Sequence, residues 1–266
     1  MSTGRWLLAL YSAVALMFLI LPILAIIPMS LNPTSFLVMP HGGLSARWYR
    51  ALAESPAWRR AFGNSLLIAT CVAVIATPLG TFGALGIARM RARMRGILLA
   101  LVVAPMAVPV VISAVAFYFL FAPLGLINSL AGMIIAHVTL AVPFVVIVVM
   151  ASLHGFDVTL LRAGASLGAP PFTVMLRILV PLIAPGVTAG AVFAFMTSFD
   201  ETVVAMFIAG PAERTLPLQI FEGVREQVSP AITAAATLLI IASCALLGFA
   251  ELLRRRGERL SRGSAD

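Results

Sequence analysis

Six long apolar stretches dominate the sequence and limit what this chain can fold into. They cover approximately residues 7–29, 65–88, 97–121, 126–150, 182–199 and 231–253. An α-helix needs about 20 apolar residues to cross a bilayer. Backbone N–H and C=O groups find no water in lipid, so such stretches form helices, which satisfy these groups internally. The sequence therefore predicts an all-α, polytopic membrane protein, in which residues 1–266 form one transmembrane domain of six helices.

Charged residues are scarce, and every basic residue other than histidine is an arginine. Hydrophobic side chains make up 61% of the chain and charged ones 11%, with a formal net charge of +8. A chain without lysine has neither a P-loop lysine nor a Schiff-base lysine, which excludes a Walker-type ATPase and a PLP enzyme. We therefore expect a protein without a catalytic site of its own; if transport uses ATP, another subunit hydrolyses it.

The sequence holds no recognisable metal or nucleophile motif. Cys71 and Cys244 lie inside apolar stretches, where they are typical of small core residues, and His41, His137 and His154 are far apart. Neither an HExxH nor a GxSxG motif occurs. We expect this chain to bind no metal ion and no cofactor.

The arginines of the connecting segments predict the orientation. Cytoplasmic loops carry an excess of basic residues. Six arginines lie in the connections expected on the outer side of the membrane, four of them between the first two stretches. In that connection, residues 44–62 have the pattern of an amphipathic helix lying on the outer membrane surface or against a partner. Both termini are expected on the other, cytoplasmic side, which carries twelve: Arg5, Arg89, Arg91, Arg93, Arg95, Arg162, Arg177, Arg254, Arg255, Arg256, Arg259 and Arg262.

The cytoplasmic connection over residues 151–181 carries helix signals of its own. Asp157 is suited to cap a short helix, and Gly168 to the left-handed position that ends it. The prolines at 170–171 suit the first turn of a second helix, which runs on to Pro181. The pattern predicts two short helices at an angle; a plain connector is the alternative.

The same segment contains a motif with fixed spacing: nine residues separate Gly168 from the run Ile178-Leu179-Val180-Pro181. This resembles the signature EAAxxxGx(9)IxLP of permease subunits of binding-protein-dependent ABC importers, in which the segment is a coupling helix that docks in a groove of the ATPase. Arg162 stands where the family has Glu, Gly164 where it has Ala, and Val180 where it has Leu. The resemblance implies these residues for ATPase coupling: Asp157, Arg162, Ala163, Gly164, Gly168, Ile178 and Pro181.

The resemblance covers nearly the whole chain. The six-span layout, Asn64-Ser65-Leu66, His137, LHGFD, and SFDETVVAMFIAGP followed by TLPLQIF are similar to the second permease of spermidine/putrescine ABC importers. This implies a type I importer permease of the bacterial inner membrane that moves a cationic solute, such as a polyamine, by alternating access. Another amino-acid-derived or opine-like solute is the alternative. The implied partners are a second, different permease, two ATPase subunits that bind ATP and Mg, and a periplasmic binding protein, with no nucleic acid.

Two adjacent acids interrupt the apolar sequence at the end of the fifth stretch. Asp200 and Glu201 are followed by apolar residues 202–209, so they lie near the membrane, where ionisable groups are costly unless they face a cavity or a partner. One interpretation leaves both acids solvated outside. The other places at least one in the pathway of a cationic solute, with Phe195 and Phe199 for cation–π contacts. Successive helix positions point about 100° apart, so both acids reach one pocket only where the helix breaks.

Other polar or helix-bending residues within the stretches have two interpretations each. For His137 a hydrogen bond between helices is favoured over a role in the solute pathway. Pro105, Pro109 and Pro143 are expected to bend their helices at packed sites, with hinges for alternating access as the alternative.

The competing functional class is a secondary transporter or channel driven by an ion gradient. That class calls for acidic residues in several spans and for two matching repeat halves. The sequence offers only the pair Asp200 and Glu201 and no convincing repeat. The ABC permease is therefore the preferred hypothesis.

Overall fold

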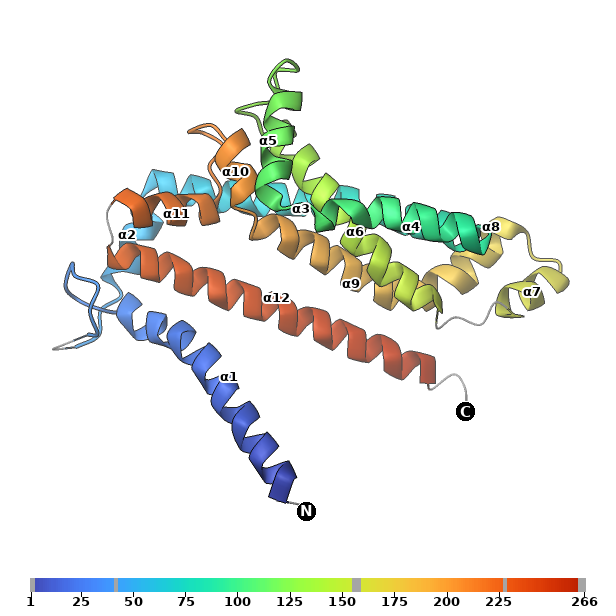
Figure 1. The fold of residues 1–266 in the computed structure, drawn as a ribbon, viewed down its shortest axis with the longest axis horizontal. Helices are drawn as coiled ribbons and strands as arrows, with labels where there is room; N and C mark the ends of the chain where they lie inside the picture. Colours follow the sequence, from blue (N-terminus) through green and yellow to red (C-terminus); the bar gives the residue numbers. More distant parts are fainter. Residues whose placement is uncertain (1–2, 41–42, 155–158, 227–228, 263–266) are drawn as a thin grey trace. The chain divides into compact units, whose positions relative to one another are not determined.

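The computed structural model describes residues 3–40, 43–154, 159–226 and 229–262, and every regular element in these ranges is a helix (Figure 1). This confirms the all-α prediction. In chain order the elements are α1 (Thr3–Ser30), α2 (Arg47–Glu54), α3 (Pro56–Ala88), α4 (Ala92–Ala107), α5 (Val110–Phe121), α6 (Leu130–His154), α7 (Thr159–Ser166), α8 (Pro171–Val174), the π-helix η1 (Met175–Leu179), α9 (Val180–Phe199), α10 (Val203–Ile208), α11 (Leu216–Glu226) and α12 (Pro230–Arg262).

Within these ranges, five helical segments are long and apolar enough to cross a membrane, and a sixth is added if the bent pair α4 and α5 counts as one span. The first, second and sixth predicted stretches lie inside α1, α3 and α12. The fourth helix, α6, begins at Leu130 rather than at residue 126. The helix count agrees with the six-span layout.

The third predicted stretch, residues 97–121, is a bent pair of helices instead of a single one. The axes of α4 and α5 differ by 96°. Between them Val108 is extended, with φ −81° and ψ 129°, and Pro109 precedes the first residue of α5. The ring of a proline disfavours the α conformation of the residue before it, which explains why the helix breaks here. The expectation that Pro109 bends this region is confirmed.

The fifth membrane segment begins earlier than predicted. Helical structure is continuous from Pro171 to Phe199, so Pro181 does not end a helix. A proline inside a helix lacks the N–H donor, and its ring crowds the carbonyl four residues back. Directly before Pro181, in η1, the N–H of Val180 donates to the carbonyl of Met175, five residues back. This wider turn accommodates the proline without a break.

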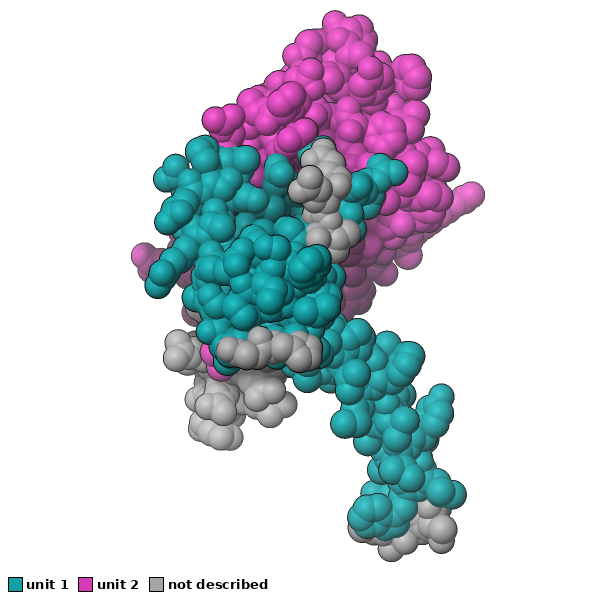
Figure 2. Space-filling view, turned by 90° about the vertical axis from the view of Figure 1, so that its left-hand side faces the viewer, with its two compact units in different colours: residues 1–59, 219–242 teal, residues 60–218, 243–266 magenta. Residues whose placement is uncertain are grey.

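The chain divides into two compact units, coloured separately in Figure 2: residues 1–59 with 219–242, and residues 60–218 with 243–266. The first unit has a small core in which Leu52 of α2 lies with Ala234 and Ala235 of α12, and Trp48 and Trp58 pack against it. The amphipathic helix predicted over residues 44–62 is instead α2 followed by the start of α3, with Ser55 in an extended conformation between them. Leu52, Trp48 and Trp58 of this segment contribute to the core of the first unit, whereas Leu44 and Phe62 are exposed.

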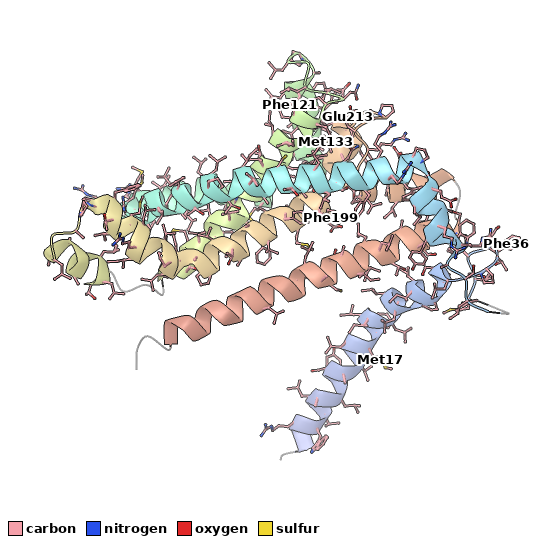
Figure 3. The ribbon with its side chains drawn as sticks, turned by 180° about the vertical axis from the view of Figure 1, so that it is seen from behind. Met17, Phe36, Phe121, Met133, Phe199 and Glu213 are labelled. Carbon is pink, nitrogen blue, oxygen red and sulfur yellow. The ribbon has the colours of Figure 1, made fainter. Side chains whose placement is uncertain are left out.

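A buried asparagine organises the segment after α1. The side-chain Nδ2 of Asn32 donates to the backbone carbonyls of Phe36 (3.0 Å) and Val38 (2.8 Å). The backbone carbonyl of Asn32 accepts from the indole N–H of Trp48 (3.0 Å). In contrast, the apolar window of α1 has no residue buried within the chain; Met17, for example, is 67% exposed (Figure 3). Apart from its last residues, α1 therefore offers most of its apolar surface to lipid or to another chain.

The core of the second unit is built around α6, where Met133 (labelled in Figure 3) and Val145 are fully buried according to their exposed areas. Glycines of two other helices lie directly against Val145. A Cβ at Gly80 of α3 would lie 2.5 Å from the Val145 Cβ, and one at Gly190 of α9 would lie 3.2 Å from its Cγ1. Small residues allow membrane helices to approach closely. The three helices α3, α6 and α9 therefore pack tightly at this level.

Candidate functional site

The helix breaks at the two adjacent acids. α9 ends at Phe199, Asp200 has φ −95° and ψ −2°, and α10 begins at Val203. The membrane-spanning segment therefore ends just before the acids. Such a break is the condition under which two successive side chains can serve the same region.

The two carboxylates have different environments. Glu201 is half-buried, and its Oε1 accepts a 2.9 Å hydrogen bond from the N–H of Val204, in the first turn of α10. Burial raises the pKa of Glu201, although hydrogen bonds from the backbone of Val203 and Val204 act in the opposite direction. Asp200 is exposed, and in the part of the chain that the structure describes its carboxylate has no hydrogen-bond or ion-pair partner. Glu201 is thus tied to the start of α10, whereas the carboxylate of Asp200 is exposed.

The two phenylalanines before the break stack on each other. The ring centroids of Phe195 and Phe199 are 5.5 Å apart and the rings are inclined by 18°. Phe199 is 3% exposed, so its ring belongs to the core, whereas Phe195 is half-buried. Of the two predicted cation–π partners, Phe195 has the more accessible ring.

His137 joins α6 to the end of α9. Its Nδ1 lies 2.9 Å from the hydroxyl oxygen of Ser198, and the side chain is fully buried. The predicted hydrogen bond between helices is confirmed. Ser198, two residues before Asp200, was not singled out in the sequence, since a serine next to a span has no distinctive pattern. In this conformation His137 has no accessible surface for a solute.

The start of α3 holds the segment between α10 and α11. The Asn64 Nδ2 donates to the carbonyls of Ala212 (2.8 Å) and Arg214 (2.9 Å), and the Ser65 hydroxyl accepts from the N–H of Leu216 (2.8 Å). The sequence features Asn64-Ser65-Leu66 and TLPLQIF are therefore linked physically, over about 150 residues. The sequence alone did not indicate that these two segments are in contact.

The predicted coupling segment forms a helix–turn–helix. Gly168 has φ +80°, as expected for the residue after α7. Its N–H donates to the carbonyl of Ala165 (3.0 Å), and the N–H of Ala169 donates to that of Gly164 (3.2 Å). These two bonds make a Schellman turn, which satisfies the last carbonyls of the helix. Pro171 occupies the first turn of α8, also as predicted. Asp157 lies outside the described residues.

Two of the proposed coupling residues pack against each other. Gly164 is buried, and a Cβ there would lie 2.7 Å from Ile178 Cδ1 and 3.3 Å from Val174 Cγ2. Arg162 and Ala163 are exposed on α7, and Leu167 at the turn is 88% exposed. The helix–turn–helix is therefore held from inside, while α7 presents arginine and leucine side chains outward.

Comparison with known proteins places these features in a family. Residues 76–258 match the family described as "Binding-protein-dependent transport system inner membrane component". The chain is 33% identical over 252 residues to the spermidine/putrescine transport system permease protein PotC of Escherichia coli (strain K12), which covers 95% of this chain and 93% of that protein. It is 36% identical over 253 residues to the putrescine transport system permease protein PotI of the same organism, which covers 91% of this chain and 88% of that protein.

A solved structure shows the same fold. A chain of a bacterial alginate ABC transporter, crystallised in complex with an alginate pentasaccharide-bound periplasmic protein, superposes with a TM-score of 0.69 at 17% identity, covering 97% of this chain and 96% of that one. With the family match over more than half of the residues and PotC similar over nearly the full length, the chain belongs to the family of binding-protein-dependent transport system inner membrane components.

Proposed function

We propose that this chain is the membrane-spanning permease subunit of an ATP-driven importer of polyamines such as spermidine and putrescine. The observation that carries this proposal is the similarity to PotC over 95% of the chain, together with that to PotI over 91%. PotC is named as a permease protein for spermidine and putrescine, and PotI as one for putrescine.

The chemistry of the α9–α10 break supports a cationic solute. A polyamine presents ammonium groups separated by short methylene chains, which suits carboxylates next to an aromatic ring. The unpartnered carboxylate of Asp200 supplies the charge, and Phe195 lies about one turn before it. The carboxyl of Glu201 has a pKa raised by burial, and a cation nearby favours its ionised form. His137 and Phe199 support this region from within the core.

The proposed mechanism is alternating access driven by partner subunits. The exposed helix α7, with Arg162, Ala163 and Leu167, docks in a groove of the ATPase, and the Schellman turn at Gly168 passes its movement to α8 and α9. ATP and Mg bind to two ATPase subunits, and this chain binds no cofactor. A second, different permease completes the pathway, and a periplasmic binding protein delivers the solute. The chain lies in the bacterial inner membrane, with both termini in the cytoplasm.

The decisive experiment is transport by the reconstituted complex. Proteoliposomes containing this chain, its co-encoded permease and its ATPase are supplied with the binding protein, enclosed ATP and labelled spermidine or putrescine. We expect uptake that requires all four components and that unlabelled polyamine suppresses, while unlabelled arginine and glutamate do not. Uptake sustained by an ion gradient without the ATPase would refute the ABC mechanism. ATP-driven uptake of a different solute, with no polyamine uptake, would refute the substrate assignment alone.

A further inference from the structure

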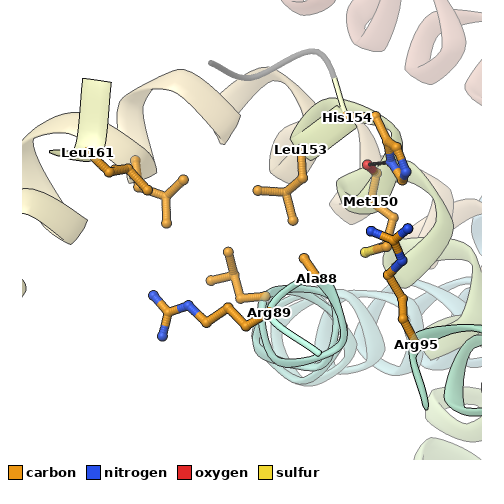
Figure 4. A pocket seen from close by; sticks show the side chains of 9 residues that line it. Ala88, Arg89, Arg95, Met150, Leu153, His154 and Leu161 are labelled. Carbon is orange, nitrogen blue, oxygen red and sulfur yellow. Dashed lines mark hydrogen bonds between the residues drawn. The ribbon is translucent and has the colours of Figure 1, made fainter. Parts of the chain in front are cut away.

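An apolar cavity of 340 Å³ lies beside α7, at the place where α3 and α6 end (Figure 4). Leu85 of α3, Leu153 of α6, Leu161 of α7 and Leu179 of η1 form its walls. A second cavity of 220 Å³ shares Leu161 and Leu179 with the first and continues along α7 as far as Ala169. The two cavities are therefore neighbours, and their shared walls lie between the helix–turn–helix and the ends of the membrane helices.

Basic side chains line the same cavity. Figure 4 shows Arg89 and Arg95 on either side of Ala88, and His154 at the end of α6. Among the described residues that line it, none is acidic. Within the described ranges neither arginine forms an ion pair, and along the sequence from Ser55 to Phe199 the only acid is Asp157. The cavity therefore combines an apolar wall with two arginines that no acid of the described residues pairs.

The position of this combination identifies the kind of ligand. The membrane-spanning helices α3 and α6 end at Ala88 and His154, so the cavity lies at a boundary between the bilayer core and water. Phospholipids have their phosphates at that boundary and their acyl chains on its apolar side. Arginine guanidinium groups bind phosphate oxygens through paired hydrogen bonds, and basic pockets between membrane helices select anionic headgroups.

We propose that this cavity is a binding site for an anionic phospholipid, with its phosphate on Arg89 and Arg95 and one acyl chain in the apolar space along α7. Free inorganic phosphate would leave the apolar wall unoccupied, and an uncharged lipid would leave both guanidinium groups without an anion. The bound lipid joins the α3–α4 turn to the helix–turn–helix. This site does not depend on which solute the protein carries.

Two double variants test the site. Arg89→Gln with Arg95→Gln removes both lining charges, while Arg91→Gln with Arg93→Gln removes the same charge from the same turn at exposed positions that do not line the cavity. The full-length chain is purified with its partner subunits in nanodiscs of phosphatidylcholine, alone or in an equal mixture with phosphatidylglycerol. Native mass spectrometry then measures the phospholipid retained on the protein, and thermal unfolding measures stabilisation by phosphatidylglycerol.

We expect the wild type and the Arg91/Arg93 variant to retain phosphatidylglycerol and to be stabilised by it. The Arg89/Arg95 variant should bind it roughly tenfold to thirtyfold more weakly and lose the stabilisation. Equal retention by all three proteins would overturn the proposal, and an equal loss in both variants would show a diffuse surface charge instead of a site. Full stabilisation of the phosphatidylcholine sample by inorganic phosphate alone would show a phosphate site and overturn the lipid assignment.

Discussion

At the scale of single residues, Asp200 and Glu201 show how adjacent carboxylates acquire different tasks. The end of α9 leaves Asp200 exposed, and the start of α10 brings the N–H of Val204 to the carboxylate of Glu201. Glu201 lies just before the N-cap residue Thr202, where a carboxylate can accept from the N–H groups of the first turn, which have no partner within the helix. Glu201 is therefore tied to the backbone, and the charge of Asp200 remains available to a cation.

This difference predicts unequal effects of two neutral substitutions. Asp200→Asn should raise the KM for polyamine uptake by about two- to fivefold, the range of an exposed ion pair. Glu201→Gln keeps an oxygen that can accept from Val204, so its effect on KM should be smaller, and both variants should assemble normally. Initial uptake rates in proteoliposomes give KM, and size-exclusion chromatography of the complex reports assembly. If Asp200→Asn leaves KM unchanged, the carboxylate is a bystander.

The local sequence predicted some of these residue roles and missed others. The hydrogen bond of His137 was predictable, because polar groups inside apolar stretches need partners. The pairing of Asn64 with the carbonyls of Ala212 and Arg214 was not, since it depends on how distant segments meet. A single sequence indicates that a polar residue in an apolar stretch needs a hydrogen-bond partner, but it does not identify the partner.

At the scale of elements, the helix–turn–helix depends on one left-handed position. Gly168 has φ +80°, and a Cβ built there meets no atom within 4 Å. Substitutions should therefore act through backbone strain alone, which costs about 1–2 kcal/mol for an ordinary L-residue and less for asparagine. A proline is excluded more strongly, because its φ is fixed near −65°.

A graded series at Gly168 tests whether this turn transmits movement. Gly168→Asn should preserve the polyamine transported per ATP hydrolysed, Gly168→Val should reduce it, and Gly168→Pro should leave ATP hydrolysis largely uncoupled from transport. Parallel assays of phosphate release and labelled uptake in one proteoliposome preparation give the ratio. Normal coupling in the proline variant would disprove the assignment of this segment as the coupling helix.

Helix packing around Val145 leads to a prediction with an internal control. Leucine at Gly80 would overlap Val145, so Gly80→Leu should destabilise the protein by about 1–3 kcal/mol through overpacking. Gly86 lies on the same helix with open space around its Cβ position, so Gly86→Leu should have little effect. Thermal unfolding of the purified variants measures the difference. A similar change in melting temperature for both would contradict the proposed packing.

Three prolines show why element boundaries were harder to predict than elements. Pro109 breaks a helix, because Val108 takes an extended conformation, whereas Pro181 is absorbed by the π-turn before it and leaves the segment continuous. Pro143 lies inside α6, which remains one helix. The same residue type therefore has different outcomes, which depend on how the neighbouring turn rearranges its hydrogen bonds.

At the scale of the whole molecule, the apolar stretches predict the number of membrane crossings, whereas the basic loops predict the orientation of the chain. The long apolar stretches predict how many times the chain crosses the membrane, and the helices of the structure agree with that number. Orientation depends on the charges that flank the spans, because the translocation machinery retains arginine-rich loops in the cytoplasm. The arginines of the α3–α4 turn and of α7 therefore predict that these segments, with the proposed lipid site, face the cytoplasm.

Single-cysteine labelling tests this orientation in intact membranes. In a background with Cys71→Ala and Cys244→Ala, Ser35→Cys places a thiol at an exposed position after α1, and Ala92→Cys places one at the exposed first residue of α4. A membrane-impermeant maleimide applied to spheroplasts should label the first variant directly and the second only after permeabilisation, since the single crossing by α3 separates their expected compartments. Direct labelling of Ala92→Cys would invert the topology, and α7 would then be inaccessible to a cytoplasmic ATPase.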